Sequence, residues 1–250
     1  MQELTAEDQS VPGGPVLWVT GGGSGMGRAT ALSAASSGWR VALSGRRPER
    51  VRAVASEVEA LGGEVLSLPG DVRSIEDVAE CASAVEQNWG RLDGLVLSAG
   101  MNAPRRTWGD QDLQEFGDII ETNLVSVARV VQLALPQLRR SAGTIVVISS
   151  YAGWRFSPGA GVAYSASKTA LASLCQFLNA QEAASGVRAC HLCPGDVDTD
   201  FLAQRPEVPG TEARSAMMTA EDVARAVQFV LDSPTHVRVD ELVISPVSQH

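Results

Sequence analysis

The stretch PVLWVTGGGSGMG, residues 15–27, joins an apolar run to a glycine-rich turn. The run VLWVT (16–20) is typical of a strand that is covered on both faces, as in a parallel sheet. A helical pattern begins near Gly25, so the glycines lie between a strand and a helix N-terminus, where backbone N–H groups favour a bound anion. Such a turn alone is equally compatible with a purely structural role.

The glycines of this turn have different expected uses. Gly21 permits a tight turn, Gly25 lets a pyrophosphate approach the backbone, and Gly27 lets the helix pack closely on the sheet. The spacing is TGxxxGxG rather than GxGxxG. The predicted nucleotide-binding turn comprises Gly21, Gly23, Ser24, Gly25, Met26 and Gly27.

Apolar strand-like runs alternate with helical patterns along the chain, and Ser74 and Thr219 stand where helix N-caps are expected. The sequence predicts strands at 16–20, 40–44, 64–69, 92–98, 143–150, 187–193 and 241–245. It predicts helices at 25–37, 48–61, 74–89, 110–140 (broken), 163–184 and 219–232. This alternation predicts an α/β fold, a single-domain, Rossmann-like, doubly wound parallel sheet of about seven strands with helices on both faces.

No repeat or internal linker interrupts this pattern. We expect residues 1–14 to form a flexible N-terminal tail and residues 15–250 to form one Rossmann-fold domain. The segment 200–218 contains prolines and glycine that interrupt any periodicity, and we expect it to be an irregular loop on the substrate side.

Composition excludes several classes of protein. The net charge of −9 argues against a nucleic-acid-binding surface. The sequence contains no run of about 18 apolar residues, so we expect no membrane span. The N-terminus has no basic–apolar signal pattern, and we therefore expect a cytoplasmic protein. The lone CxxC pair, Cys190 and Cys193, has no second pair, and its odd offset places the thiols on opposite strand faces. We therefore expect buried thiols and no metal.

The end of the second predicted strand indicates the cofactor. Proteins that bind a free ribose 2′-hydroxyl commonly place a carboxylate there, whereas this chain has Ser44, Gly45, Arg46 and Arg47. Arginine makes bidentate, charge-assisted hydrogen bonds to phosphate, so the pair Arg46 and Arg47 favours NADP, with NAD as the alternative. The alternative is a solvated surface pair. It leaves the two arginines unexplained, because cations at the start of a helix oppose the helix dipole.

Three residues near the fifth predicted strand suggest proton-transfer chemistry. Tyr164 and Lys168 are four residues apart at the start of a helix and share one face. A phenol titrates near pH ~10 in isolation, and an adjacent ammonium favours its ionised form. Ser150, at the carboxyl end of its strand, can hydrogen-bond a substrate oxygen. Each feature has an ordinary structural reading, but together they favour catalysis beside a nucleotide turn.

Taken together, these motifs resemble those of the short-chain dehydrogenase/reductase family in its form of about 250 residues. The resemblance extends from Val16 to Gln249. Its motifs occur in family order: TGGGSGMG, DV (71–72), SAG (98–100), TNL with Asn123, ISS, YSASK and PGDVDT (194–199).

The resemblance implies a role for each matching residue. Tyr164 would be the general acid/base, Lys168 would lower the pKa of Tyr164 and bind the nicotinamide ribose, and Ser150 would orient the substrate oxygen. Asn123 would interrupt its helix and support a proton-relay water linked to Lys168. The remaining implied cofactor contacts are Asp71, Val72, Ser98, Ala99, Gly100, Pro194, Gly195, Val197 and Thr199.

Two departures from the family pattern stand out. Ser98 replaces the usual asparagine that braces the central sheet, so its hydrogen bonds must be made differently or partly lost. Ser150 precedes Tyr164 by fourteen residues where thirteen is more common, and we expect the extra residue, within WRFSPGAGV, to reshape the substrate side. The tail PTHVRVDELVISPVSQH resembles that of NADP-dependent members acting on small alcohols, including serine and other 3-hydroxy acids.

The predicted function is an NADP-dependent oxidoreductase that interconverts an alcohol and a ketone or aldehyde, with a small-molecule substrate. The alternative is a catalytically silent NADP(H)-binding regulatory protein, which would predict the loss of a catalytic residue. A nucleic-acid role for the basic cluster at 46–52 is opposed by the acidic charge.

We expect the substrate pocket to draw on Trp154, Arg155 and Phe156, on the segment before Tyr164, and on 200–218. Ordinary packing or a subunit contact is the alternative for Trp154 and Phe156. Arg155 is a candidate partner for a substrate carboxylate, with an exposed arginine that has no ligand as the alternative. By analogy with the family we expect a homotetramer, or a dimer, joined through the helices at 110–140 and 163–184.

Overall fold

A computed structural model describes residues 13–249, and the expected tail therefore lies mostly outside the described residues. The chain forms a seven-stranded sheet in the order β3-β2-β1-β4-β5-β6-β7, with every neighbouring pair parallel. This confirms the predicted fold class. The strands are β1 (Val16–Thr20), β2 (Arg40–Gly45), β3 (Val65–Pro69), β4 (Gly94–Leu97), β5 (Thr144–Ile148), β6 (Arg188–Pro194) and β7 (Glu241–Ile244).

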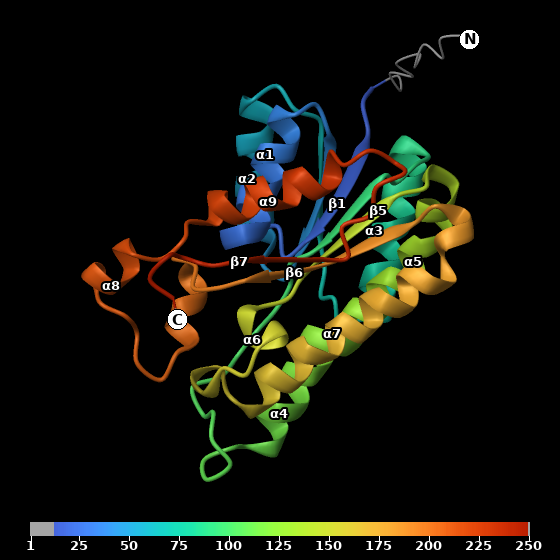
Figure 1. The fold of residues 1–250 in the computed structure, drawn as a ribbon. Coiled ribbons are helices and arrows are strands. Elements are labelled where there is room, and N and C mark those ends of the chain that lie inside the picture. Colours follow the sequence, from blue (N-terminus) through green and yellow to red (C-terminus); the bar gives the residue numbers. More distant parts are fainter. Residues whose placement is uncertain (1–12, 250) are drawn as a thin grey trace, which may run out of the picture.

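Helices cover both faces of the sheet (Figure 1). α1, α2 and α9 pack on one face around Leu17 and Val19, and α3, α5 and α7 pack on the other around Trp18 and Leu95. Neighbouring residues of β1 thus enter different cores, because successive side chains of a strand point to opposite faces. The helices are α1 (Gly25–Ser36), α2 (Pro48–Ala60), α3 (Ile75–Trp89), α4 (Leu113–Ile120), α5 (Ser126–Ser141), α6 (Tyr151–Trp154), α7 (Val162–Gln181), α8 (Thr211–Ser215) and α9 (Ala220–Leu231).

Local capping explains where two of these helices begin. The Ser74 hydroxyl accepts a hydrogen bond from the Asp77 N–H at the start of α3. Thr219 and Asp222 form a reciprocal capping box at the start of α9. These bonds satisfy backbone N–H groups that have no partner inside the helix, as expected from the sequence.

The long helical segment after β4 contains a π-helical turn, η1 (Glu121–Val125), between α4 and α5. The expected break is therefore an insertion into a continuous helical segment. By length and composition alone, Leu113–Ser141 could cross a membrane, and 44% of its apolar window is buried inside the molecule. Because Val130, Ala134 and Leu138 belong to the core beside the sheet, we interpret the segment as a core helix.

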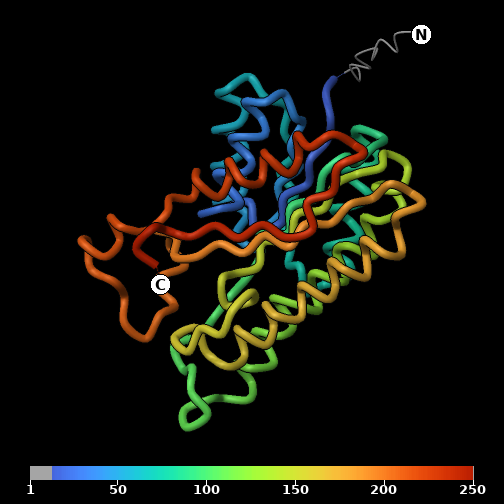
Figure 2. Tube along the Cα trace, in the orientation of Figure 1, coloured from blue at the N-terminus to red at the C-terminus, as the bar shows by residue number. Residues whose placement is uncertain are grey.

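All seven strands run in parallel, so their carboxyl ends lie at the same edge of the sheet. Figure 2 shows the chain leaving this edge in long excursions at about residues 100–112 and 195–218. The second excursion was expected to be irregular, but it contains η4 (Asp200–Gln204), a 3-10 helix, and α8. These excursions and the glycine-rich turn surround the site described next.

Candidate active site

The glycine-rich turn lines an elongated cavity of about 560 Å³ at the carboxyl ends of β1, β2 and β4. Most of the residues predicted to bind a dinucleotide lie on its wall. They are Gly21, Gly23, Ser24, Gly25, Met26, Arg46, Arg47, Val72, Ser98, Ala99, Gly100 and Thr199.

The turn requires glycine for two physical reasons. Gly21 has a φ of +66°, and a Cβ atom there would lie 2.7 Å from the Ala99 nitrogen. A Cβ atom at Gly27 would lie 2.4 Å from the Gly21 carbonyl oxygen, so Gly27 shapes the turn from behind the cavity. Ser24, the N-cap of α1, makes no side-chain capping bond, and the first turn of α1 carries no acidic residue. The N-terminus of α1 thus fits an anionic group, because its N–H groups need a partner and its dipole favours negative charge.

Positive charge gathers at the β2 end of this cavity. Arg46 and Arg47 are exposed and line it, and Arg47 Nη2 lies 3.4 Å from Ser24 Oγ. Arg50, in the first turn of α2, forms an ion pair of 2.9 Å with Asp200 at the start of η4. Among residues 13–249, Asp200 is the one acidic residue that lines this cavity. Its ion pair with Arg50 offsets its negative charge.

The Asp71 carboxylate is bound by a neighbouring arginine, and its implied cofactor contact stays a prediction. Its carboxylate accepts hydrogen bonds from the Arg73 backbone N–H at 3.0 Å and from Arg73 Nε at 3.2 Å. Asp71 is absent from the wall of the dinucleotide cavity, whereas Val72 lines it. The Arg73 guanidinium, two residues away, holds this carboxylate in an ion pair.

The missing asparagine at position 98 is replaced by a brace from β1. Thr20 Oγ1 accepts hydrogen bonds from the backbone N–H groups of Ser98 at 3.2 Å and Ala99 at 3.4 Å. The Thr20 hydroxyl donates in turn to the Val96 carbonyl at 3.5 Å. The loop after β4 is therefore fixed to β1 without an asparagine side chain.

A second cavity, also of about 560 Å³, adjoins the first and contains the residues of the predicted chemistry. Ser150, Tyr164 and Lys168 all line it, together with Pro194, Gly195 and Val197. The two spaces adjoin, because five residues line both: Met26, Ser98, Gly100, Thr199 and Phe201.

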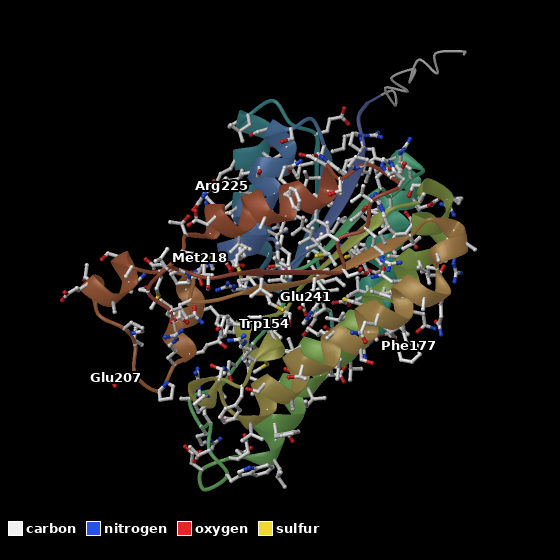
Figure 3. All side chains as sticks on the ribbon, in the orientation of Figure 1. Trp154, Phe177, Glu207, Met218, Arg225 and Glu241 are labelled. Atoms are coloured by element: carbon white, nitrogen blue, oxygen red, sulfur yellow. The ribbon has the colours of Figure 1, made fainter. Side chains whose placement is uncertain are left out.

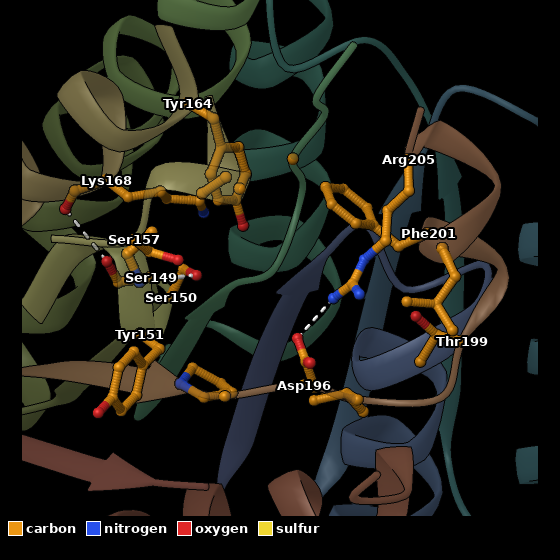
Figure 4. Close-up of a pocket in the computed structure, with 18 of the residues that line it drawn as sticks. Ser149, Ser150, Tyr151, Ser157, Tyr164, Lys168, Asp196, Thr199, Phe201 and Arg205 are labelled. Atoms are coloured by element: carbon orange, nitrogen blue, oxygen red, sulfur yellow. Dashed lines mark hydrogen bonds and ion pairs between the residues drawn. The ribbon is translucent and has the colours of Figure 1, made fainter. Parts of the chain in front are cut away.

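Within this second cavity, Figure 4 shows Tyr164 and Ser150 on one side and Asp196, Phe201 and Arg205 on the other. Ser150 caps the short helix α6, and its hydroxyl accepts a hydrogen bond from the Ala152 N–H. Lys168 donates from Nζ to the Ile148 carbonyl at 2.8 Å, and Nζ lies 5.7 Å from the centre of the Tyr164 ring.

Burial dominates the electrostatics of Tyr164 and Lys168. It raises the pKa of the Tyr164 phenol, while the Ser150 hydroxyl and the positive charges of Arg106 and Arg205 act to lower it. Burial also lowers the pKa of Lys168 to about 8. Burial of the phenol thus outweighs the groups that stabilise its charge, and the effect expected of Lys168 on the pKa of Tyr164 stays a prediction.

Asn123 lies in η1, behind Tyr164 and Lys168, and is fully buried. Its Oδ1 accepts from the Met101 N–H at 2.8 Å, and its Nδ2 donates to the Met101 carbonyl at 2.8 Å and to Ser167 Oγ at 3.1 Å. The Ser167 hydroxyl donates to the Tyr164 carbonyl at 2.7 Å. The Asn123 side chain thus braces the loop after β4 and the helix that carries Tyr164.

The expected substrate wall of Trp154, Arg155 and Phe156 is wrong. None of the three lines the second cavity; the Phe156 side chain is 90% exposed, and the Arg155 guanidinium lies 4.3 Å from the centre of the Trp154 ring. The physical reason is that α6 continues the chain outward after Ser150. The segment before Tyr164 does contribute, through Ser157, Gly159 and Ala160, and so does the excursion after β6.

Two arginines that the sequence analysis did not select, Arg106 and Arg205, line the second cavity instead. Neither belongs to a motif, and each reaches the cavity from a different excursion. The CxxC thiols are buried, as expected. Cys190 enters the α1/α9 core, and Cys193 lies against His191 with 3.4 Å between Sγ and Nδ1. Cys193, His191 and Glu241 together form a group that could hold a metal, so the expected absence of a metal stays a prediction.

Comparison with known proteins identifies the family. The short chain dehydrogenase profile matches residues 15–209. An uncharacterized oxidoreductase from Staphylococcus aureus (strain MW2) is 32% identical over 230 residues, which cover 92% of this chain and 96% of that protein. This chain belongs to the short-chain dehydrogenase family. The family assignment made from the motifs is confirmed.

Solved structures agree with this assignment. An alcohol dehydrogenase from the archaeon Thermococcus sibiricus, complexed with 5-hydroxy-NADP, has a TM-score of 0.85 and 31% identity, with coverage of 94% of this chain and 98% of that one. The closed form of serine dehydrogenase complexed with NADP+ has a TM-score of 0.86 and 26% identity, with coverage of 94% and 96%. This short-chain dehydrogenase therefore shares both fold and family with NADP-binding oxidoreductases.

Proposed function

We propose that this short-chain dehydrogenase is an NADP-dependent oxidoreductase that interconverts an alcohol and a ketone or aldehyde. The observation that supports this most is that the two cavities adjoin and share five lining residues. Ser150, Tyr164 and Lys168 face one of them, and the glycine-rich turn faces the other. A cofactor that extended from the turn through the shared residues would end beside the Tyr164 phenol.

The bound dinucleotide would supply or accept the hydride. The residues that would hold it are those of the glycine-rich turn, Val72, the Ser98–Gly100 backbone and Thr199. Ser150 would hold the substrate oxygen by a hydrogen bond. Tyr164 would donate a proton to that oxygen in reduction and remove it in oxidation. The Lys168 ammonium would stabilise the ionised phenol as negative charge develops there.

The charge around the β2 end supports NADP over NAD. Arg46 and Arg47 are exposed on the cavity wall, and the acidic residue nearby is already paired with Arg50. A 2′-phosphate would therefore meet two guanidinium groups and no free carboxylate. The Thermococcus and serine dehydrogenase structures hold NADP-type cofactors, which agrees with this proposal.

A homotetramer assembled through α4, α5 and α7 is part of the proposal. Exposed apolar side chains lie on this helical segment and on α7, among them Leu113 at 82% and Phe177 at 63% exposure. Figure 3 shows Phe177 on the outer side of α7, away from the sheet. We also propose a cytoplasmic location, which the four free, buried cysteines support because thiols persist in reducing compartments.

Substitution of Tyr164 tests the proposed function. A panel of alcohols and carbonyl compounds with NADP(H) and NAD(H), followed by nicotinamide absorbance, would first identify a substrate. Tyr164→Phe should then lower kcat by at least about 10²-fold while NADPH affinity stays within about twofold. Tyr151→Phe, in the same cavity, is the matched control. Equal turnover by wild type and Tyr164→Phe would refute the mechanism, and NADPH binding with no turnover of any compound would favour the silent regulatory protein.

A further inference from the structure

Two guanidinium groups face the cavity that contains the Tyr164 phenol. Arg106 comes from the excursion after β4, and Arg205 follows η4 in the excursion after β6. Both line the same cavity as Tyr164, and their positive charges act to lower the pKa of its phenol. Figure 4 shows Arg205 across the cavity from Tyr164.

Arg106 carries a charge without an acidic partner. Its guanidinium donates to three backbone carbonyls: Ala103 at 2.9 Å, Gly159 at 2.8 Å and Gln204 at 2.8 Å. Within residues 13–249, no carboxylate lies within ion-pair distance of it. Arg106 therefore ties together three segments around the cavity and leaves its positive charge uncompensated there.

Arg205 has a partner but keeps free donors. Its Nη2 lies 2.5 Å from Asp196 Oδ1, and the side chains of Arg205 and Asp196 are 31% and 41% exposed. Within residues 13–249, the Arg205 guanidinium makes one hydrogen bond, from Nη2 to Asp196. Its other N–H groups are therefore left for a ligand. A partly exposed ion pair contributes little stability, so an incoming anion can share or replace Asp196 at small cost.

The charges on the cavity wall do not cancel. Arg106, Lys168 and Arg205 are cationic, Asp196 and Glu207 are acidic, and one positive charge remains. Glu207 lies at the exposed rim, so the excess is greater near Tyr164 than at the entrance. A ligand with a single negative charge would balance it, and a planar carboxylate matches the fork of a guanidinium.

We propose that the substrates of this enzyme are small hydroxy acids and the corresponding oxo acids, whose carboxylate is bound by Arg205. This inference rests on the proposed function, since it names the substrate class of the same site. The carboxylate would lie on the Arg205 side of the cavity, and the reacting carbon would lie near Ser150 and Tyr164. Arg106 acts as a positioning residue, because it binds the Gln204 carbonyl next to Arg205.

Matched substrates and variants test this assignment. Each of 2-, 3- and 4-hydroxybutyrate would be compared with the butanediol that has a neutral CH₂OH group in place of the carboxylate. For at least one pair, wild type should favour the acid in kcat/KM by about tenfold or more. Arg205→Gln should lower kcat/KM for that acid by about 10- to 100-fold, mainly by raising KM. The same variant should change kcat/KM for the diol by less than about threefold.

Two further variants sharpen the comparison. Asp196→Asn removes the competing carboxylate and should lower KM for the acid. Arg155 lies outside the cavity, so Arg155→Gln should leave kcat/KM unchanged for both the acid and the diol. The assignment is overturned if kcat/KM for every diol equals or exceeds that for its acid. It is also overturned if Arg205→Gln lowers kcat/KM equally for both members of a pair. A preference for phosphorylated alcohols over the acids would also overturn it.

Binding without turnover separates this inference from the proposed function. Saturation-transfer NMR on Tyr164→Phe should detect each preferred hydroxy acid, and the signal should disappear in Tyr164→Phe/Arg205→Gln. Binding with this dependence, but no turnover by wild type, would leave the carboxylate site standing and refute the oxidoreductase. Turnover of neutral alcohols without binding of any acid would refute the carboxylate site and leave the proposed oxidoreductase standing.

Discussion

Asn123 and Ser167 join the π-helical turn of the molecule to its catalytic helix through a hydrogen bond of 3.1 Å between Nδ2 and Oγ. The same asparagine binds both backbone groups of Met101, and Ser167 binds the carbonyl of Tyr164. One buried amide therefore connects the loop beside the cofactor cavity, the π turn η1, and α7. The position of the Tyr164 phenol depends on this connection as well as on its own helix.

Removal of this amide should destabilise the protein. In Asn123→Ala the Met101 N–H and carbonyl lose their partners in a buried setting, and we expect the free energy of unfolding to fall by about 2–4 kcal/mol. Urea denaturation would measure the change. Asn88→Ala is the control, because that exposed side chain makes one hydrogen bond, to the Ala84 carbonyl. Equal stability of the two variants would contradict the bracing role.

The lowered pKa of Lys168 predicts a pH-dependent cost of folding. Below pH 8 this lysine is charged in both folded and unfolded chains, so the folded state carries the full burial penalty. Between pH 8 and 10.5 the folded chain has lost this proton and the unfolded chain retains it, so stability rises with pH. Lys168→Met should therefore be more stable than wild type at pH 7, with an advantage that falls by up to about 3 kcal/mol towards pH 10.5.

Urea denaturation of wild type and Lys168→Met at several pH values measures this difference directly. Only the difference between the two proteins is used, because other groups titrate equally in both. A difference that stays constant from pH 7 to pH 10 would show that burial does not perturb this lysine.

Ser150 should influence both rate and pH dependence. Burial raises the pKa of Tyr164 and the Ser150 hydroxyl lowers it, so Ser150→Ala should raise that pKa further. In alcohol oxidation the ionised phenol is the base, so the rising limb of the pH–rate profile should move to higher pH. We expect kcat to fall by about 10²-fold because a hydrogen bond to the reacting oxygen is lost.

Ser157→Ala is the matched control for Ser150→Ala, since Ser157 lines the same cavity. Its profile should overlay that of wild type. A downward shift of the limb in Ser150→Ala, or an unchanged kcat, would argue against the assigned role of Ser150.

The double variant Arg46→Ala/Arg47→Ala tests cofactor choice. Loss of two guanidinium groups should weaken NADP binding by about 10- to 100-fold and NAD binding by less than about threefold. Calorimetric titration with both dinucleotides gives the comparison. Arg52→Ala, an exposed arginine of α2 outside the cavity, should change neither affinity. Equal losses for NADP and NAD would remove the case for 2′-phosphate recognition.

Local sequence signals predicted the frame of the molecule well. The expected segment 16–20 matches β1, and the predicted helix at 25–37 matches α1 to within one residue at its end. Apolar runs, capping residues and glycines act over a few neighbouring residues, so their consequences can be recognised along the chain. For the same reason Tyr164 and Lys168, four residues apart on one helix, were placed together correctly in one cavity.

The substrate side could not be predicted in this way. Arg106 binds Gly159 and Gln204, which are 53 and 98 residues away in sequence, and no local pattern marks such contacts. Trp154 follows Ser150 closely, yet one short helix directs it away from the cavity. Asp71 fits its family motif, but its nearest cation, Arg73, determines where its carboxylate lies.

The ion pair between Arg50 and Asp200 fastens one end of η4 to α2. Arg205, just past the other end of η4, is fastened to Asp196. Phe201, between these anchors, borders both cavities. Because one side chain of this short helix belongs to both walls, a substitution at Phe201 should alter the binding of the nucleotide and of the reacting molecule together.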